Sequence, residues 1–392
     1  MDIYRINPSL DSPLLSTLFD MEALRYEFVS GDTPPWLFYD LKEVMHLLES
    51  VASARIEGNH TTLLSAANDI VNRGRKTTNE SLMELANIRQ AIQYVEENIK
   101  KDSTISLKHL REIHKLTVHG LHIDGSSNPG GFRNEQVRIE GSQCPVSLPS
   151  LINAQMQELI DYINLPTEPK YGIIKIACAH HRFTVIHPFD NGNGRTARTL
   201  TYAMLIQQGF LRKSKAILNP SSIFCIDRVA YYNTLSAADT GTADGVEQWC
   251  AYVSNGVLNE LQRVRKLLDK PYAVSTIMLP ALKLSKENGL ISDTDLTILK
   301  VAMEKDLIQA SDVIHLFGPS PSARTICSRY LAKMVGKELL MRHPNFPKKY
   351  AMRFMNRPLL PSVLQIMGDN GLIPMENNSI GAHRRKTTPT NS

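Results

Sequence analysis

The most restrictive feature of this sequence is a short polar stretch, HPFDNGNGRTAR, at residues 187–198. An apolar helical pattern over residues 172–183 precedes it, and a second one begins near Gly194 and continues through Ile206. Gly192 and Gly194 fall at the junction, where their backbone freedom allows a tight turn. The sequence therefore predicts two helices joined by a short, sharply turning loop.

The same stretch combines groups suited to binding phosphate. The first N–H groups of a helix that starts near Gly194 lack helical partners and attract anions. Arg195 and Arg198 are three residues apart, so their guanidinium groups share one face of that turn. His187 lies just upstream, and an imidazole accepts a proton at neutral pH. Each feature alone is common in ordinary structure, but together and in this order they indicate a phosphate site with a base beside it.

Composition indicates a globular protein of two or three domains. The chain has 392 residues, 42% of them hydrophobic, enough for one substantial core and a smaller second one. Its five cysteines are scattered, which argues against a disulfide framework or a zinc site and for a reducing compartment. No stretch approaches the roughly 18 apolar residues of a membrane span, and the N-terminus has no apolar targeting segment. We expect a cytoplasmic protein that does not enter a membrane.

The N-terminal part of the chain, residues 1–100, is predicted to be a helical region. Its main helical patterns cover residues 41–56, 69–73 and 83–99. The first of these stops at Gly58, and glycine commonly terminates helices. Ser53 and Glu57 lie four residues apart at its end, so they share one helix face. Without other information, this face would be a solvated one followed by a helix stop.

Residues 101–268 are predicted to form a second helical unit that contains one hairpin. Its helical patterns cover residues 107–118, 151–162, 172–183, 228–238 and 249–266, with a loop at 219–222. A polar and apolar alternation, typical of a strand, is formed by Gln136, Val137, Arg138 and Ile139. A turn at residues 140–142 then leads back toward Cys144 and Val146, which favours a short β-hairpin, with a surface loop as the alternative.

The C-terminal part is predicted to contain a linker helix at residues 269–290 and a winged-helix-like domain at residues 291–373. Three helical patterns, at 295–303, 310–317 and 322–340, precede aromatic residues suited to short strands. Residues 319–357 contain nine lysines and arginines and one acid, Glu338. The final residues, 374–392, are predicted to be a disordered tail.

The third helix of this domain is predicted to have one apolar and one basic face. The residues expected to face inward are Ile326, Met334, Val335 and Leu339. The residues expected to face water are Arg324, Arg329, Lys333 and Lys337. A basic recognition helix would bind DNA, whereas a helical appendage for homodimerisation or substrate contact is the alternative.

The stretch at 187–198 resembles the signature of the Fic family, HPFx(D/E)GNGRxxR, and departs from it at Asn191, where the family usually has an acidic magnesium ligand. Residues 53–58 resemble the family's inhibitory element, (S/T)xxxE(G/N). The resemblance implies a mainly α fold: a Fic-type helical core with a short β-hairpin flap, beside an N-terminal helical region that carries the inhibitory helix. It also implies transfer of AMP from ATP to a Ser, Thr or Tyr hydroxyl of a target protein, with Mg²⁺ present.

The resemblance assigns roles to individual residues. His187 is implied as the catalytic base. The nucleotide-binding residues implied are Gly192, Asn193, Gly194, Arg195, Arg198 and Tyr232, the last as a contact for adenine. The inhibitory element is Ser53, Glu57 and Gly58, with Glu57 paired to Arg198 in place of the ATP γ-phosphate. The flap residues Gln136, Val137, Arg138 and Ile139 would dock the target by strand addition. A metal would be held by Asn191 or Asp190.

Two other functions remain open from the sequence. A DNA-binding regulator would use the Fic core as a nucleotide sensor rather than as a catalyst. Removal of AMP, or transfer of another phosphate-linked group, would use the same fold for related chemistry.

Overall fold

The computed structural model describes residues 6, 8–27, 35–71, 79–138, 145–210, 220–354 and 358–373, and these are mostly helical. The elements in chain order are α1 (Pro13–Glu27), α2 (Pro35–Ile56), α3 (Leu63–Val71), α4 (Glu80–Asn98), α5 (Leu107–Thr117), α6 (Pro149–Asn164), η2 (Pro169–Tyr171), α7 (Gly172–Ile186), α8 (Asn193–Gln207), α9 (Pro220–Ile226), α10 (Arg228–Asp239), α11 (Ala243–Leu268), α12 (Lys270–Tyr272), η3 (Ala273–Met278), α13 (Leu279–Glu287), α14 (Asp293–Lys305), α15 (Ala310–Val313), η4 (Ile314–Phe317), α16 (Ala323–Gly336), β1 (Leu340–His343), β2 (Phe346–Met352) and α17 (Leu360–Asp369). The mainly α fold class is confirmed. No helix within these ranges is long and apolar enough to cross a membrane.

Capping residues account for two of the differences between predicted and observed helix starts. α4 begins earlier than predicted because Asn79 caps it by accepting from the N–H of Leu82. α11 begins earlier because Thr242 caps it by accepting from the N–H of Gly245. The loop predicted at residues 219–222 is wrong, because Pro220 starts α9, and proline is well suited to a first helical turn.

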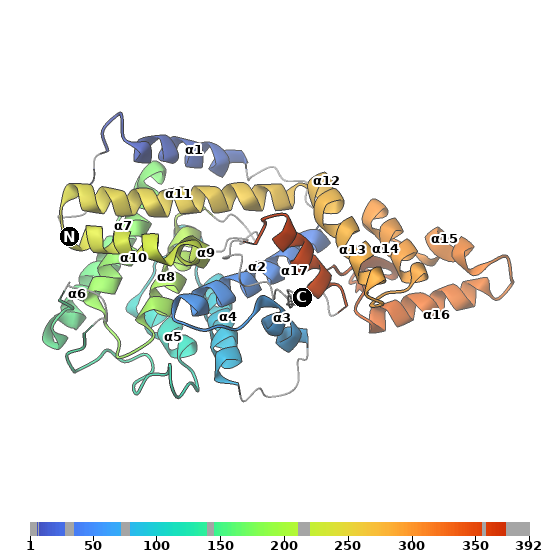
Figure 1. Ribbon diagram of the computed structural model, residues 1–392, viewed down its shortest axis with the longest axis horizontal. Helices are drawn as coiled ribbons and strands as arrows, with labels where there is room; N and C mark the ends of the chain where they lie inside the picture. The colour runs from blue at the N-terminus through green and yellow to red at the C-terminus, as the bar shows by residue number, and fades with distance from the viewer. Residues whose placement is uncertain are drawn as a thin grey trace, which may run out of the picture.

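The core around α7 and α8 is held by contacts with helices that follow them in the chain, α9, α10 and α11. α11 runs along one side of the molecule, with α1 packed on its outer face (Figure 1). Trp249 of α11 is fully buried, and its indole N–H donates to the Ala177 carbonyl of α7 at 2.7 Å. His180, Phe224 and Tyr231 pack around this indole. These contacts fix α7, whose end leads into the loop at residues 187–192, called the signature loop below.

α2 contacts both the helical core and the C-terminal part of the chain. It packs against α4 and α9, and its last turn carries Ser53 to α8. Near its other end, Asp40 accepts a hydrogen bond from the backbone N–H of Phe354, which lies beyond β2. The segment that was predicted to be inhibitory is therefore held between the helical core and the C-terminal part of the chain.

The predicted flap is attached to the signature loop at its base. The Arg133 guanidinium donates to four carbonyls, and the shortest bonds are to those of His187, Glu135 and Ser147, at 2.7, 2.7 and 2.6 Å. The Gln136 side chain donates across to Val146 at 3.3 Å. Gln136, Val137 and Arg138 carry no strand assignment, and Ile139 and the turn lie outside the described residues. The hairpin stays a prediction.

The C-terminal part has the expected order of three helical segments followed by a two-stranded antiparallel hairpin, β1 and β2, and lies at the end of the molecule opposite α6 (Figure 1). The prediction that Ile326 faces inward is wrong, since it is 44% exposed. The inward face of α16 is instead formed by Ala323, Cys327, Leu331 and Met334. Lys337, predicted to face water, pairs with the buried Asp295 at 3.0 Å. The domain boundaries stay predictions, and the predicted tail lies outside the described residues.

Candidate functional site

The signature loop is rigidly built. α7 ends at His187, which adopts a left-handed conformation with φ 49° and ψ 61°, and Gly192 follows with φ 73° just before α8. The Asn193 side chain closes the loop, accepting from the N–H of Phe189 at 3.0 Å and donating to its carbonyl at 2.9 Å. The prediction that this side chain binds nucleotide is therefore not supported, because its amide is used inside the loop.

His114 of α5 holds the signature loop through a hydrogen bond and a ring contact that were not predicted from the sequence. Its Nδ1 accepts from the N–H of Gly130 at 2.9 Å, so its Nε2 carries the proton and donates to the Asn191 carbonyl at 3.0 Å. Its ring stacks on Phe189 with the ring centres 3.7 Å apart. Burial lowers the pKa of His114 to about 4, so this neutral tautomer persists at physiological pH.

His187 is held in the form that accepts protons. Burial lowers its pKa to about 4, and the positive charge of Arg133 acts in the same direction, outweighing the opposing effects of the Thr184 backbone and Glu57. The imidazole is therefore neutral at pH 7, as a general base requires.

Arg198 binds the end of α2 through three hydrogen bonds. Its Nε donates to the Ser53 hydroxyl at 3.0 Å, and its terminal nitrogen donates to the Ser53 carbonyl at 2.9 Å and to Glu57 Oε1 at 2.7 Å. Arg198 is 1% exposed, whereas the Glu57 side chain is 34% exposed. The expected contact is thus present between a buried arginine and a partly exposed carboxylate.

The Glu57 carboxylate also covers the first turn of α8. A Cβ atom placed on Gly194 would lie 2.1 Å from Glu57 Oε1, so the carboxylate fills the space that this glycine leaves open. Gly58, with φ 99°, ends the helix and turns the chain away. Burial by itself would raise the pKa of Glu57, but Arg198 and then Arg195 outweigh it and lower the pKa, so the group is ionised.

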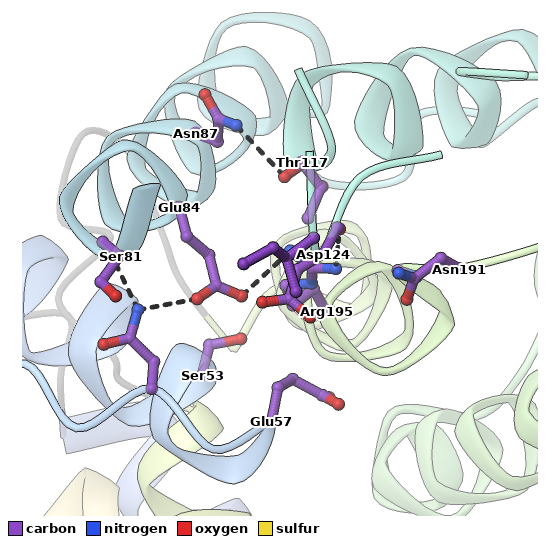
Figure 2. A network of polar contacts seen from close by, with 12 residues as sticks. Ser53, Glu57, Ser81, Glu84, Asn87, Thr117, Asp124, Asn191 and Arg195 are labelled. Carbon is purple, nitrogen blue, oxygen red and sulfur yellow. Dashed lines mark hydrogen bonds and ion pairs between the residues drawn. The ribbon is translucent and has the colours of Figure 1, made fainter. Parts of the chain in front are cut away.

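Arg195 has different partners from those predicted. One terminal nitrogen donates to Glu84 Oε1 of α4 at 2.9 Å and the other to the Asp124 carbonyl at 2.7 Å. Figure 2 shows this pair beside Ser53 and Glu57. The predicted role of Arg195 as a phosphate ligand is not supported by this arrangement, because its terminal nitrogens are taken up by protein. Glu84 carries no local sequence signal and was missed.

The side-chain oxygens of both candidate metal ligands already accept hydrogen bonds from the protein. The carboxylate of Asp190 accepts from the hydroxyls of Ser126 and Ser127 at 2.6 Å and from the N–H of Ser127 at 2.8 Å. The Asn191 side-chain oxygen accepts from the N–H of Gly192 at 2.7 Å. No cluster of three metal-binding side chains occurs within the described ranges. These residues do not fit a protein-held Mg²⁺ site.

Tyr232 is placed where a ligand can reach it. It is 46% exposed on α10, while its neighbour Tyr231 is buried with its hydroxyl 3.1 Å from His180 Nε2. Asp239, the last residue of α10, lies 2.9 Å from His181 Nε2. Both histidines are thus partners of the α10 helix.

We predict that the His187 imidazole titrates with a midpoint near the pKa of about 4 given by its burial. Because the pKa of histidine is about 6.5 in an unfolded chain, the native state binds fewer protons than the unfolded state between these values. The contribution of His187 to stability is therefore present above about pH 6.5 and is lost as the pH falls toward 4. Histidine-labelled NMR, assigned with His187→Gln, measures the midpoint, and a value near that of the unfolded chain would contradict the burial described.

Comparison with known proteins places this geometry in a family. The model of the Fic/DOC family matches residues 104–205. The chain is 29% identical over 238 residues to the protein adenylyltransferase Fic of Nematostella vectensis, covering 59% of this chain and 52% of that protein. It is 29% identical over 199 residues to the protein adenylyltransferase fic-1 of Caenorhabditis elegans, covering 47% and 35%. The chain thus spans about half, or less, of the length of these relatives.

Solved structures agree on the fold. A Fic family protein from Desulfovibrio desulfuricans G20 superimposes with a TM-score of 0.57 at 16% identity, over 89% of this chain and 98% of that chain. A fragment of Fic-1 from Caenorhabditis elegans gives a TM-score of 0.52 at 23% identity, over 64% and 71%. The matched residues contain His187, the signature loop and most of α8, and residues 104–205 of this chain therefore form a Fic domain.

Proposed function

We propose that this chain is a protein adenylyltransferase that transfers AMP from ATP to a serine, threonine or tyrosine hydroxyl of a target protein. The relatives that match it carry this activity in their names. The observation that carries the proposal is the arrangement at α8: a neutral imidazole, a glycine-opened helix N-terminus and a buried arginine meet at one place. This combination suits phosphoryl chemistry, which relies on positioning and charge neutralisation.

The proposed nucleotide site is centred on the first turn of α8. The backbone N–H groups of Asn193 and Gly194 would bind phosphate oxygens, because they lie at the start of a helix. Gly192, whose own N–H donates to Asn191, would let the phosphates approach the backbone closely. Arg198 would bind the terminal phosphates in place of Glu57. The exposed ring of Tyr232 would contact the adenine. Mg²⁺ would arrive with the nucleotide, since the side-chain oxygens of Asp190 and Asn191 already accept hydrogen bonds from the protein.

The proposed reaction is a direct displacement. His187 takes the proton from the target hydroxyl, whose oxygen forms a bond to the α-phosphorus. The bond from the α-phosphorus to the bridging oxygen breaks in line with the attack, and pyrophosphate leaves. The flap segment, with Gln136, Val137, Arg138 and Ile139, would hold the target main chain by strand addition, and Arg133 fixes its base to His187.

Glu57 would keep the resting enzyme inactive. Its carboxylate occupies the first turn of α8 and neutralises Arg198, so an ATP terminal phosphate would have to displace it. Its partial exposure and its place at the very end of α2 make such displacement feasible without unfolding the helix.

We predict that label transfer from α-labelled ATP to protein is low for the wild type, raised by about tenfold or more in Glu57→Gly, and abolished by His187→Ala in either background. The reason is that the first change opens the phosphate site and the second removes the base. The measurement is label incorporation into a cell lysate.

Glu338→Gly is the matched control for this experiment, because Glu338 is an exposed carboxylate just beyond another helix, α16. It should transfer label like the wild type. Equal transfer by the wild type, Glu57→Gly and His187→Ala would reject both the catalytic and the inhibitory assignments. If Glu57→Gly instead lost the ability to remove AMP from a modified protein, hydrolysis would be the main activity.

A second candidate function, binding of DNA by the C-terminal part, is supported by its exposed basic side chains. Arg324, Arg329 and Lys333 of α16 are exposed, as are Lys348 and Lys349 of β2. A homodimer interface would be the alternative use of this face.

We predict that binding to duplex DNA weakens steeply with salt and that Arg324→Gln/Arg329→Gln/Lys333→Gln lowers the salt slope by roughly 3, because each phosphate contact adds about one unit. Fluorescence anisotropy over a salt series measures the slope. An unchanged slope, or no binding by the wild type at low salt, would exclude this function.

A further inference from the structure

Arg195 and Glu84 form a second ion pair beside that of Arg198 and Glu57. The second pair is much more deeply buried. The two side chains are 2% and 4% exposed. Arg195 reaches from the first turn of α8 to Glu84 in the interior of α4, and its other terminal nitrogen holds the Asp124 carbonyl. One arginine therefore joins three segments that are distant in the sequence, as Figure 2 shows.

Glu84 is itself held in place from the other side. The Asn59 amide donates to Glu84 Oε2 at 2.7 Å and to the Ser81 carbonyl at 3.0 Å. Asn59 in turn accepts from the N–H of Thr61 at 2.9 Å, so its orientation is set locally. Both carboxylate oxygens of Glu84 thus have fixed donors, and the carboxylate points at Arg195 in one orientation.

The two signature arginines consequently differ in what their partners can do. Glu57 is partly exposed at a helix end and can leave Arg198, whereas Glu84 is enclosed within α4 and cannot leave Arg195 without disrupting the helix packing. If Arg195 turned to a phosphate, a buried carboxylate would remain unpaired next to an incoming polyanion. Breaking a buried pair in this way is strongly unfavourable.

We propose that Glu84 is a positioning residue, which holds Arg195 in a permanent pair that fixes the first turn of α8, and that Arg195 supports the phosphate site without binding phosphate. This rests on the proposed nucleotide site. The pair is neutral as a whole, so Arg198 supplies the exchangeable positive charge. Asn59, which directly follows the inhibitory Glu57-Gly58 turn, ties that turn to the same support.

The test uses the full chain in the Glu57→Gly background, with Glu84→Gln, Arg195→Met, both together, and Arg198→Met as the matched arginine control. Affinity for a fluorescent ATP analogue, kcat and KM for label transfer, and melting temperature are measured for each. We expect each single change at the pair to lower kcat by about tenfold and to lower the melting temperature, because it leaves a buried group unpaired.

The double variant shows whether Arg195 positions the first turn of α8 or binds phosphate itself. We expect it to recover affinity to within about threefold of the background and to recover much of the lost melting temperature, since two coupled residues show strong non-additivity. Arg198→Met should lose affinity by more than about tenfold. Two results would overturn the proposal. One is a double variant that binds the analogue as poorly as Arg198→Met, and the other is a double variant whose loss of melting temperature equals the sum of the losses in the two single variants. A background protein that binds the analogue but transfers no label would reject the proposed function, while the affinity series would still decide the role of Arg195.

Discussion

The ion pair between Arg198 and Glu57 is the interaction on which the rest of this site depends. A helix N-terminus beside an arginine attracts anions, and here the protein supplies its own carboxylate to fill that place. Because α2 and α8 are far apart in the chain, the pair also joins the N-terminal region to the Fic domain. Under the proposed function, nucleotide binding and this helix–helix contact would compete for the same guanidinium group.

The residues around this pair are arranged so that they would keep their positions while Glu57 and a nucleotide exchange at Arg198. The loop before α8 is closed by Asn193, stacked on His114 and anchored by Arg133. The ion pair of Arg195 and Glu84 holds the first turn of α8 beside it. His187 remains neutral because its surroundings exclude water and its neighbour Arg133 is positive. In the proposed function, the partly exposed Glu57 would be the group that moves, and the residues around it would stay in place.

Local patterns were sufficient to predict most of the helices, since apolar spacing and caps act over a few residues. They fail at Pro220, where the sequence predicts a loop but the proline starts a helix, and at Ile326, which the spacing places on the wrong face of α16. The partners of the signature residues were harder to predict. Glu57 was found because a short motif marks it, whereas Glu84 and His114 act only through tertiary contacts that no local spacing encodes.

The most direct test of the account is the affinity of the full chain for ATP, measured by isothermal titration calorimetry with and without the Glu57 carboxylate. Glu57→Gln keeps the size of the side chain and removes its charge, so the competition for Arg198 is weakened while the fold is retained. We predict binding tighter than the wild type by about tenfold, the equivalent of one charge-assisted hydrogen bond. Equal affinity for the two proteins would contradict the claim that Glu57 and the nucleotide compete for Arg198.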